Sequence, residues 1–221
     1  MKKDLQKKRI MIYFIDATNL IIEKEGLDAV TIRKVADLAG YNSATIYNYF
    51  KNLDHLILFA SIKYLKEYIK DLSKNIESTN KTLKNYLIIW KYFCIHSFKN
   101  PKIYNLIFCS KFSDSIDGVM NIYYNLFPNE LPKSSLCLNS MLLNSNIFDR
   151  NLTILKESLV NYSLSDDDFN YLNEMIILLY EGMLKKMLIS NYDVEERVMS
   201  MIIYIKKILS SFNILTDIDY R

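Results

Sequence analysis

Residues 31–51, TIRKVADLAGYNSATIYNYFK, constrain the fold more than any other stretch, because they predict two short helices joined by a tight turn. Thr31 can cap a first helix over 32–39, since its side chain can accept from the free backbone N–H groups of the first turn. Gly40 follows at the position where a left-handed backbone is easiest for glycine. A second helix is then expected over residues 43–50.

The second of these helices has little apolar surface. Asn42 can cap it, and Ile46 with Phe50 one turn later give it a narrow stripe that can be buried. Ala36, in the first helix, places a small side chain where the two helices must nearly touch. Such a helix is typical of one that faces a nucleic acid, although helix–Gly–helix corners also occur in proteins that never contact DNA. The side chains of its remaining face can all form hydrogen bonds; they are Ser43, Thr45, Tyr47, Asn48 and Tyr49.

Residues 9–65, about a quarter of the chain, resemble the DNA-binding region of the tetracycline-repressor-like (TetR/AcrR) family of bacterial regulators. The resemblance implies an all-α fold, with an N-terminal helix-turn-helix, three-helix DNA-binding domain over residues 1–52. It also implies a larger helical domain over residues 53–221 for effector binding and dimerisation. The matching positions are Gly26, Ala36, Gly40, Thr45, Ile46, Tyr47, Phe50 and Lys51.

The resemblance implies which side chains contact DNA. Thr45, Asn48 and Ser43 are expected at base edges, and the other polar side chains at phosphates. The sequence departs from the family in having Leu53 where a lysine is usual, and Ser43 where a basic or small polar residue is common. Phosphate affinity is therefore expected to depend more on Lys51, Arg33 and the amino terminus. The full candidate set is Arg33, Ser43, Ala44, Thr45, Tyr47, Asn48, Tyr49 and Lys51.

The first nine residues form an arm that carries five cations. Clustered lysine and arginine attract phosphates through counterion release, although a basic terminus can also serve only solubility. The formal net charge of +3 is mild, so a nucleic-acid role must be local. The cations are Lys2, Lys3, Lys7, Lys8 and Arg9.

The rest of the chain is also predicted to be helical. The whole sequence contains only four glycines and three prolines, which disfavours a turn-rich β-protein. One linking helix is expected over 53–75, another over 82–99, a third from Pro101 and a fourth over 114–127. Residues 134–163 are expected to form one or two irregular helices. We expect a cytoplasmic protein for three reasons. The three cysteines have no CxxC spacing, no signal peptide is evident, and no apolar run is long enough to span a membrane.

The last two helices predict self-association. Ser165 begins the first with three aspartates, which fit a capped helix start better than a metal site. Apolar residues over 169–188 and over the final helix, 194–215, cover most of the circumference, so each helix needs partners on more than one side. Gly182 would let two backbones approach closely. We therefore expect a two-fold homodimer through a four-helix bundle, with a fully buried monomer core as the alternative.

Aromatic side chains in the middle of the chain predict an apolar cavity, although aromatic residues at helical spacing often form only core. The resemblance implies a small-molecule effector there. No catalytic triad, phosphate loop or metal cluster is visible, and His55 and His96 fit structural roles, so no enzyme, metal or cofactor is expected. The alternative function is a helical ligand-carrier or interaction dimer, which would survive deletion of residues 1–52. The cavity candidates are Tyr86, Trp90, Phe93, Tyr104, Phe108, Tyr123 and Phe148.

Overall fold

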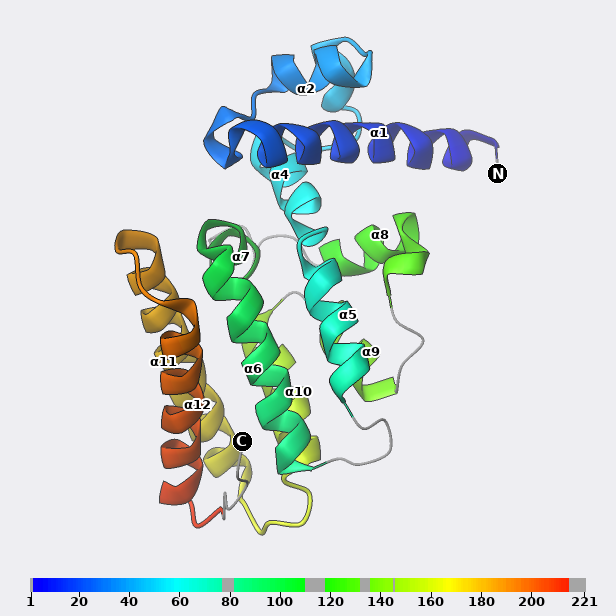
Figure 1. Ribbon diagram of the computed structural model, residues 1–221. Coiled ribbons are helices and arrows are strands. Elements are labelled where there is room, and N and C mark those ends of the chain that lie inside the picture. Colours follow the sequence, from blue (N-terminus) through cyan, green and yellow to red (C-terminus); the bar gives the residue numbers. More distant parts are fainter. Residues whose placement is uncertain (1, 77–81, 110–117, 132–135, 145, 215–221) are drawn as a thin grey trace.

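The structure is a computed structural model that describes residues 2–76, 82–109, 118–131, 136–144 and 146–214, apart from the side chains of 136–138. These residues form α-helices and short 3₁₀ turns, with no strand among them, as the all-α prediction requires. Figure 1 shows a small helical unit at the amino terminus, mounted on one end of a larger bundle.

The amino-terminal unit confirms the predicted caps. The Thr31 side chain accepts from the backbone N–H of Lys34 at 3.3 Å, and Gly40 is left-handed with φ 75° and ψ 29°. The Asn42 side chain accepts from the backbone N–H of Ala44 at 2.9 Å. The elements of this unit are α1 (Lys2–Glu25), the 3₁₀ turn η1 (Leu27–Ala29), α2 (Ile32–Ala39) and α3 (Ser43–Ile46), and α4 (Leu53–Ile62) follows them towards the bundle.

The predicted end of the second helix, near Phe50, is wrong, because regular α-helix stops at Ile46. A tighter turn follows, in which the N–H of Asn48 donates to Thr45 C=O at 3.2 Å and that of Tyr49 to Ile46 C=O at 3.0 Å. Aromatic residues and asparagine are poor helix formers. The tighter turn also brings Phe50 into the core, where it is 1% exposed.

The predicted single linking helix over 53–75 is also wrong, since α4 and α5 (Leu65–Asn75) are separate helices. The interruption is at Lys63 and Tyr64, where the backbone N–H groups donate to carbonyls three residues earlier. The two helices pack on different partners: α4 on α1 and α7, and α5 on α6. A straight helix could not follow both sets of neighbours, so the chain bends between them.

The bundle surrounds α6, which contacts α5, α7, α10, α11 and α12. The predicted helices over 82–99 and from Pro101 are confirmed. The helix expected over 114–127 is seen from Val119 onwards, and 110–117 lie outside the described residues. The bundle elements are α6 (Leu83–Lys99), α7 (Pro101–Phe108), α8 (Val119–Leu126), η2 (Pro128–Glu130), α9 (Leu136–Leu143), α10 (Ile147–Ser158), α11 (Asp166–Ile189) and α12 (Val194–Ser211).

The last helix ends earlier than predicted. Asn213 adopts a left-handed backbone with φ 59°, and the N–H of Ile214 donates to Leu209 C=O at 3.2 Å. This pair forms a Schellman-type helix end, which satisfies carbonyls of the last turn. Helix α12 therefore stops at Ser211, and residue 215 lies outside the described part of the chain.

Candidate functional site

An aromatic core fixes the orientation of the helix-turn-helix. Phe14 of α1 is fully buried, and its ring centroid lies 5.2 Å from that of Tyr41, 6.2 Å from Tyr49 and 6.4 Å from Phe50. Ile46 is also fully buried. Because one side of the α3 segment is held against this core, the opposite side must point outwards.

That opposite side is open to solvent. Ala44, Tyr47 and Asn48 are exposed, with Tyr47 58% exposed, and Lys51 is exposed just beyond the turn. The remaining predicted residues of this segment are half-buried; they are Ser43, Thr45 and Tyr49. Seven of the eight predicted DNA-contacting residues therefore lie on one continuous segment, residues 43–51. We call this segment the reading segment.

Arg33, the eighth predicted residue, lies on α2, which packs against α3. Its side chain is 90% exposed and its Nε lies 3.9 Å from the Asp37 carboxylate. An exposed pair of this kind contributes little to stability, so Arg33 is free to exchange its partner for a phosphate. Lys34 is held more closely, with its Nζ 2.6 Å from Glu25.

The predicted basic arm is the start of α1, which is helical from Lys2 onwards. Its five cations are all exposed. The arm therefore presents its charges on α1, the helix that lies between α2 and the bundle in Figure 1 and belongs to the same amino-terminal unit as the reading segment. A helical arrangement fixes the positions of these charges more than an extended arm would.

His55 joins the reading segment to α4. Its Nδ1 accepts from the backbone N–H of Lys51 at 3.0 Å, so the neutral ring carries its proton on Nε2. The Asn52 side chain accepts from the backbone N–H of His55 at 2.8 Å and caps α4. Burial, and next the positive charge of Lys51, lower the pKa of His55. These contacts place His55 between the reading segment and the first turn of α4.

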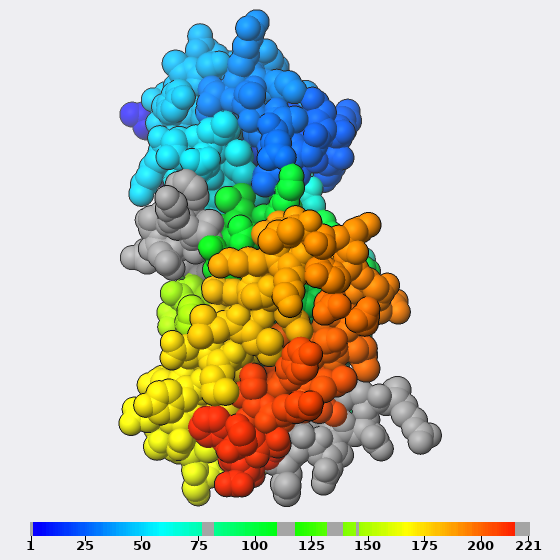
Figure 2. All heavy atoms as spheres, turned by 90° about the vertical axis from the view of Figure 1, so that its left-hand side faces the viewer, coloured from blue at the N-terminus to red at the C-terminus, as the bar shows by residue number. Residues whose placement is uncertain are grey.

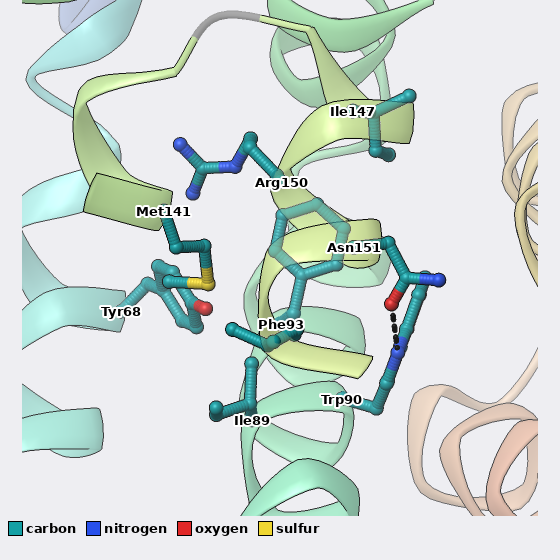
Figure 3. Close-up of a pocket in the computed structure, with 9 residues that line it drawn as sticks. Tyr68, Ile89, Trp90, Phe93, Met141, Ile147, Arg150 and Asn151 are labelled. Atoms are coloured by element: carbon teal, nitrogen blue, oxygen red, sulfur yellow. Dashed lines mark hydrogen bonds between the residues drawn. The ribbon is translucent and has the colours of Figure 1, made fainter. Parts of the chain in front are cut away.

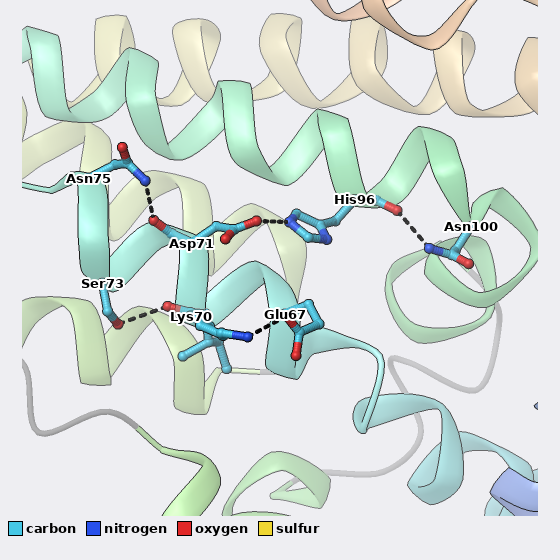
Figure 4. A network of polar contacts seen from close by, with 8 residues as sticks. Glu67, Lys70, Asp71, Ser73, Asn75, His96 and Asn100 are labelled. Carbon is cyan, nitrogen blue, oxygen red and sulfur yellow. Dashed lines mark hydrogen bonds and ion pairs between the residues drawn. The ribbon is translucent and has the colours of Figure 1, made fainter.

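Ion pairs and hydrogen bonds connect the small unit and α5 to the bundle. Lys102 of α7 pairs with Asp28 of η1 at 2.8 Å, across the junction between the two parts. His96 Nε2 of α6 lies 2.9 Å from Asp71 Oδ2 of α5, and Figure 4 shows this contact among the local bonds of α5. A displacement of α5 relative to α6 would therefore disturb specific side-chain contacts.

A cavity lies between α5, α6, α9 and α10. Its volume is about 20 Å³, which is room for about one water molecule, and Figure 3 shows side chains converging on it from these helices. Its walls are mostly apolar, with a single guanidinium and one side-chain amide among them. The lining residues are Tyr68, Ile89, Trp90, Phe93, Met141, Ile147, Arg150, Asn151 and Ile154.

Two of the seven predicted cavity residues, Trp90 and Phe93, line this cavity, and the other five do not. Tyr86 lies next to it, since its hydroxyl donates to Asn151 Oδ1 at 3.0 Å. Tyr104 and Phe108 pack their rings on the far side of Phe93, at 5.6 and 5.4 Å. Tyr123 of α8 donates to Glu130 at 2.8 Å, away from the cavity. Phe148 is 37% exposed.

The sequence interpretation missed Arg150 and Asn151, the two polar side chains of α10 in the cavity wall. Asn151 Oδ1 accepts from Tyr86 and from Trp90 Nε1, both at 3.0 Å, and its Nδ2 donates to Asn173 at 2.9 Å. The spacing of positions 147, 150, 151 and 154 is that of one buried helix face, so a polar pair at its centre was a usable signal.

Helices α11 and α12 expose apolar side chains along one face of the bundle, which Figure 2 shows from that side. On α11 these side chains follow helical spacing, and Gly182 continues the same row, with nothing within 4 Å of a Cβ added there. We call this set the apolar face. Its residues are Tyr171, Met175, Leu178, Leu188 and Ile189 of α11, and Met199, Ile203 and Tyr204 of α12.

The acidic start of α11 is a capping box. The Ser165 hydroxyl accepts from the backbone N–H of Asp168 at 3.1 Å, and the Asp168 carboxylate accepts from the backbone N–H of Ser165 at 3.0 Å. Within the described residues, no group of three or more His, Cys, Asp or Glu side chains is arranged to hold a metal ion. No described helix is long and apolar enough to cross a membrane.

Comparisons with known proteins agree with the geometry of the amino-terminal unit. The sequence model of the bacterial tetR family of regulatory proteins matches residues 14–58, which include the whole reading segment. An uncharacterised HTH-type transcriptional regulator of Haemophilus influenzae is 27% identical over 124 residues. That alignment covers 54% of this chain and 66% of the relative, so the chain spans just under two thirds of the relative's length.

Two solved structures are similar to this chain at low sequence identity, and the first of them shares its fold. A candidate transcriptional regulator from Pseudomonas aeruginosa PAO1 is 13% identical, with 90% of each chain covered and a TM-score of 0.51. A TetR transcriptional regulator from Rhodococcus sp. RHA1 is 12% identical, with 92% of this chain and 96% of that chain covered and a TM-score of 0.47. The match to residues 14–58, together with the outward-facing side of the reading segment, identifies the amino-terminal unit as a helix-turn-helix of the kind found in the tetR family of bacterial regulatory proteins.

Proposed function

We propose that the protein represses transcription by binding a palindromic operator as a homodimer, and that a small-molecule effector in the central cavity releases it. The observation that carries this proposal is the exposure of Ala44, Tyr47 and Asn48 above a core centred on the buried rings of Phe14 and Phe50. A polar surface held on a short helix and on the tight turn that follows it can enter a major groove. Within this proposal the protein acts in the cytoplasm and has no enzymatic activity.

In this proposal the reading segment divides its contacts between bases and phosphates. Asn48 pairs with an adenine edge, and Thr45 packs its methyl group on a thymine, with Ser43 beside it at the start of α3. Ala44 lies between Ser43 and Thr45, and its small side chain allows the backbone to approach the DNA closely. The residues that fix the register on phosphates are Arg33, Tyr47, Tyr49 and Lys51, together with the cations at the start of α1.

The apolar face supports the homodimer. Eight large apolar side chains on two neighbouring helices, 36% to 83% exposed, form a concentration of a kind that marks an interface. Pairing α11 and α12 with the same helices of a second copy gives a four-helix bundle with a two-fold axis. Two reading segments related by that axis can then meet successive major grooves, about 34–36 Å apart.

The contacts of α5 support a route from the cavity to DNA. Tyr68 of α5 lines the cavity, and Asp71 one turn later is bonded to His96 of α6. An effector that separates α5 from α6 would act through the bend at residues 63–64 on α4, which packs on α1. We place the boundary between the DNA-binding domain and the effector domain at residue 52, immediately before α4.

Selection of bound sequences from random DNA, followed by binding measurements over a range of salt concentrations, tests this function. Asn48→Ala should reduce the preference for the selected site over scrambled DNA about tenfold or more, because one base contact is lost. Lys51→Ala should weaken binding to both DNAs equally and lower the salt dependence by about one phosphate contact.

Lys74→Ala provides the control, since Lys74 is an exposed cation at the far end of α5. This variant should leave both the preference for the selected site and the salt dependence of binding unchanged. The proposal fails if Asn48→Ala and Lys51→Ala change binding to the selected and scrambled DNAs in the same way.

A further inference from the structure

His55 holds the backbone at the end of the reading segment. The turn after α3 is closed by backbone hydrogen bonds, and the N–H of Phe50 donates to Ile46 C=O at 2.9 Å. The next N–H along the chain, that of Lys51, donates to a side-chain atom, His55 Nδ1, at 3.0 Å. Lys51 therefore leaves the turn with its backbone fixed by one ring nitrogen of α4.

The surroundings of His55 hold this ring in place. Its centroid lies 5.9 Å from the ring of Phe50 and 5.0 Å from that of Phe59, in edge-to-face arrangements. Both phenylalanines are 1% exposed. The second ring nitrogen, Nε2, is buried. Since Nδ1 is bonded and Nε2 is buried, His55 is not placed to contact DNA itself, and an effect of this ring on DNA would act through Lys51.

The bond to Lys51 requires the neutral ring. A backbone N–H is a donor, so Nδ1 can accept from it only while Nδ1 carries no proton. Burial, and next the charge of Lys51, lower the pKa of His55, so the ring is neutral near neutral pH. The helices packed on α4 are α1, α5, α7 and α8, and among the described residues none of their charged groups acts on the ring. Asp54, its neighbour on α4, is exposed.

We propose that neutral His55 is a positioning residue for DNA binding: it holds the backbone of Lys51 so that the Lys51 ammonium reaches a phosphate, and a proton on Nδ1 ends that arrangement. This inference rests on the proposed function, in which Lys51 is a phosphate contact. The proton turns Nδ1 from an acceptor into a donor that faces the donor of Lys51, so the hydrogen bond is lost. The protein then binds its operator more weakly as the pH falls.

The direction of this effect separates positioning from charge. A histidine that acted only through its charge would strengthen DNA binding when protonated, because added positive charge attracts phosphates. A histidine that positions Lys51 weakens DNA binding when protonated. The loss of affinity at low pH can also be no larger than the loss caused by Lys51→Ala, since His55 acts through that side chain.

Operator affinity is measured with the full-length protein at constant ionic strength, from about pH 7.5 to about pH 5, the range in which histidines titrate. Wild-type affinity should fall about threefold to tenfold over this range, which is on the order of one phosphate contact. Lys51→Ala should bind more weakly than the wild type at neutral pH and should lose this pH dependence.

Two variants of His55 separate the acceptor from the ring. His55→Phe keeps an aromatic ring against Phe50 and Phe59 but has no acceptor, so it should bind more weakly than the wild type at neutral pH and show no pH dependence. His55→Asn carries an amide oxygen at the branch point where histidine carries Nδ1, and this oxygen does not titrate. It should recover most of the affinity that His55→Phe loses, again without pH dependence.

Nuclear magnetic resonance of the free wild-type protein tests the contact itself. The backbone amide signal of Lys51 should shift together with the titrating ring of His55, because its N–H loses its acceptor. The amide of Ala44 is the matched control, since its acceptor is the side chain of Asn42, which does not titrate. This measurement needs neither DNA nor a variant, so it decides about the contact even if a His55 variant fails to fold.

The inference is overturned if operator affinity stays constant or rises as the pH falls, or if the Lys51 amide does not follow His55. It is also overturned if His55→Phe binds as tightly as the wild type at neutral pH, or if any of the three variants keeps the wild-type pH dependence. A selected operator that is bound with pH-independent affinity contradicts only the role of His55. If no DNA sequence is selected at all, the proposed function fails, and this role of His55 fails with it.

Discussion

The two ends of the molecule present their functional side chains in opposite ways. In the amino-terminal unit the side chains proposed to contact DNA are mostly exposed, and local caps at Thr31 and Asn42 set their positions. In the bundle the polar groups of the cavity are buried, and segments far apart in the chain bring them together. Asn151, for example, accepts from Trp90, which lies 61 positions earlier.

This difference predicts how each region responds to change. A reading surface that is exposed and locally supported can lose a side chain with little effect on folding, so substitutions there act on DNA binding. A buried polar cavity has no solvent to replace a lost partner, so substitutions there act on stability and ligand binding together. The apolar face differs from both, because its side chains are exposed in one chain, and in the proposed homodimer a second chain covers them.

The largest effect is expected at the apolar face. Leu178→Glu should weaken the dimer at least about a hundredfold, because the carboxylate would be buried without a partner. Analytical ultracentrifugation measures the dissociation constant. Val160→Glu is the matched control, since Val160 is 67% exposed but lies outside this face, between α10 and α11. Equal dimer affinity in both variants would remove the apolar face from the account.

A smaller but still large loss is expected inside the bundle. Asn151→Ala should lower the free energy of unfolding by about 2–4 kcal/mol, because buried groups of Tyr86, Trp90 and Asn173 lose their partner. Chemical denaturation followed by circular dichroism measures this change. Asn170→Ala, at an exposed position of α11, should change stability by less than about 0.5 kcal/mol. Similar losses in the two variants would mean that the Asn151 network has no special role.

Removal of a cap in the amino-terminal unit should cost less. Asn42→Ala should lower the free energy of unfolding by about 1 kcal/mol, since it removes one helix-capping hydrogen bond and leaves no buried group unpaired. The same denaturation measurement applies, with Asn48→Ala as the control, because the exposed Asn48 amide has no such capping contact to lose. A loss as large as that of Asn151→Ala would show that the two regions are not built differently.

The smallest effect is a pH dependence at the junction of the two regions. Because the pKa of His55 is lowered in the folded protein, the unfolded chain binds more protons in the window below its ordinary value of about 6.5. The contribution of this group to stability is therefore complete above that value and is lost as the pH falls through the lowered pKa. Unfolding midpoints on either side of this window should differ less in His55→Gln than in wild type, and an unchanged difference would exclude His55 as the cause.

The same contrast explains which features were predictable from the sequence. The helix over 32–39 and the left-handed Gly40 follow from residues within a few positions of each other, and the structure shows both. The bend at residues 63–64 depends on α4 and α5 packing on different helices, and no proline or glycine marks it. Arg150 and Asn151 were missed because their partners come from α6, α9 and α11, which only the folded bundle brings together.

Hydroxyl-radical footprinting on the selected operator tests most directly whether the apolar face holds two reading segments on one duplex. The account predicts two protected stretches related by two-fold symmetry and centred about 34–36 Å apart on one face of the DNA. With Leu178→Glu at the same protein concentration, the simultaneous protection of the two stretches should disappear. A single protected stretch for the wild-type protein, or joint protection that survives Leu178→Glu, would contradict the account.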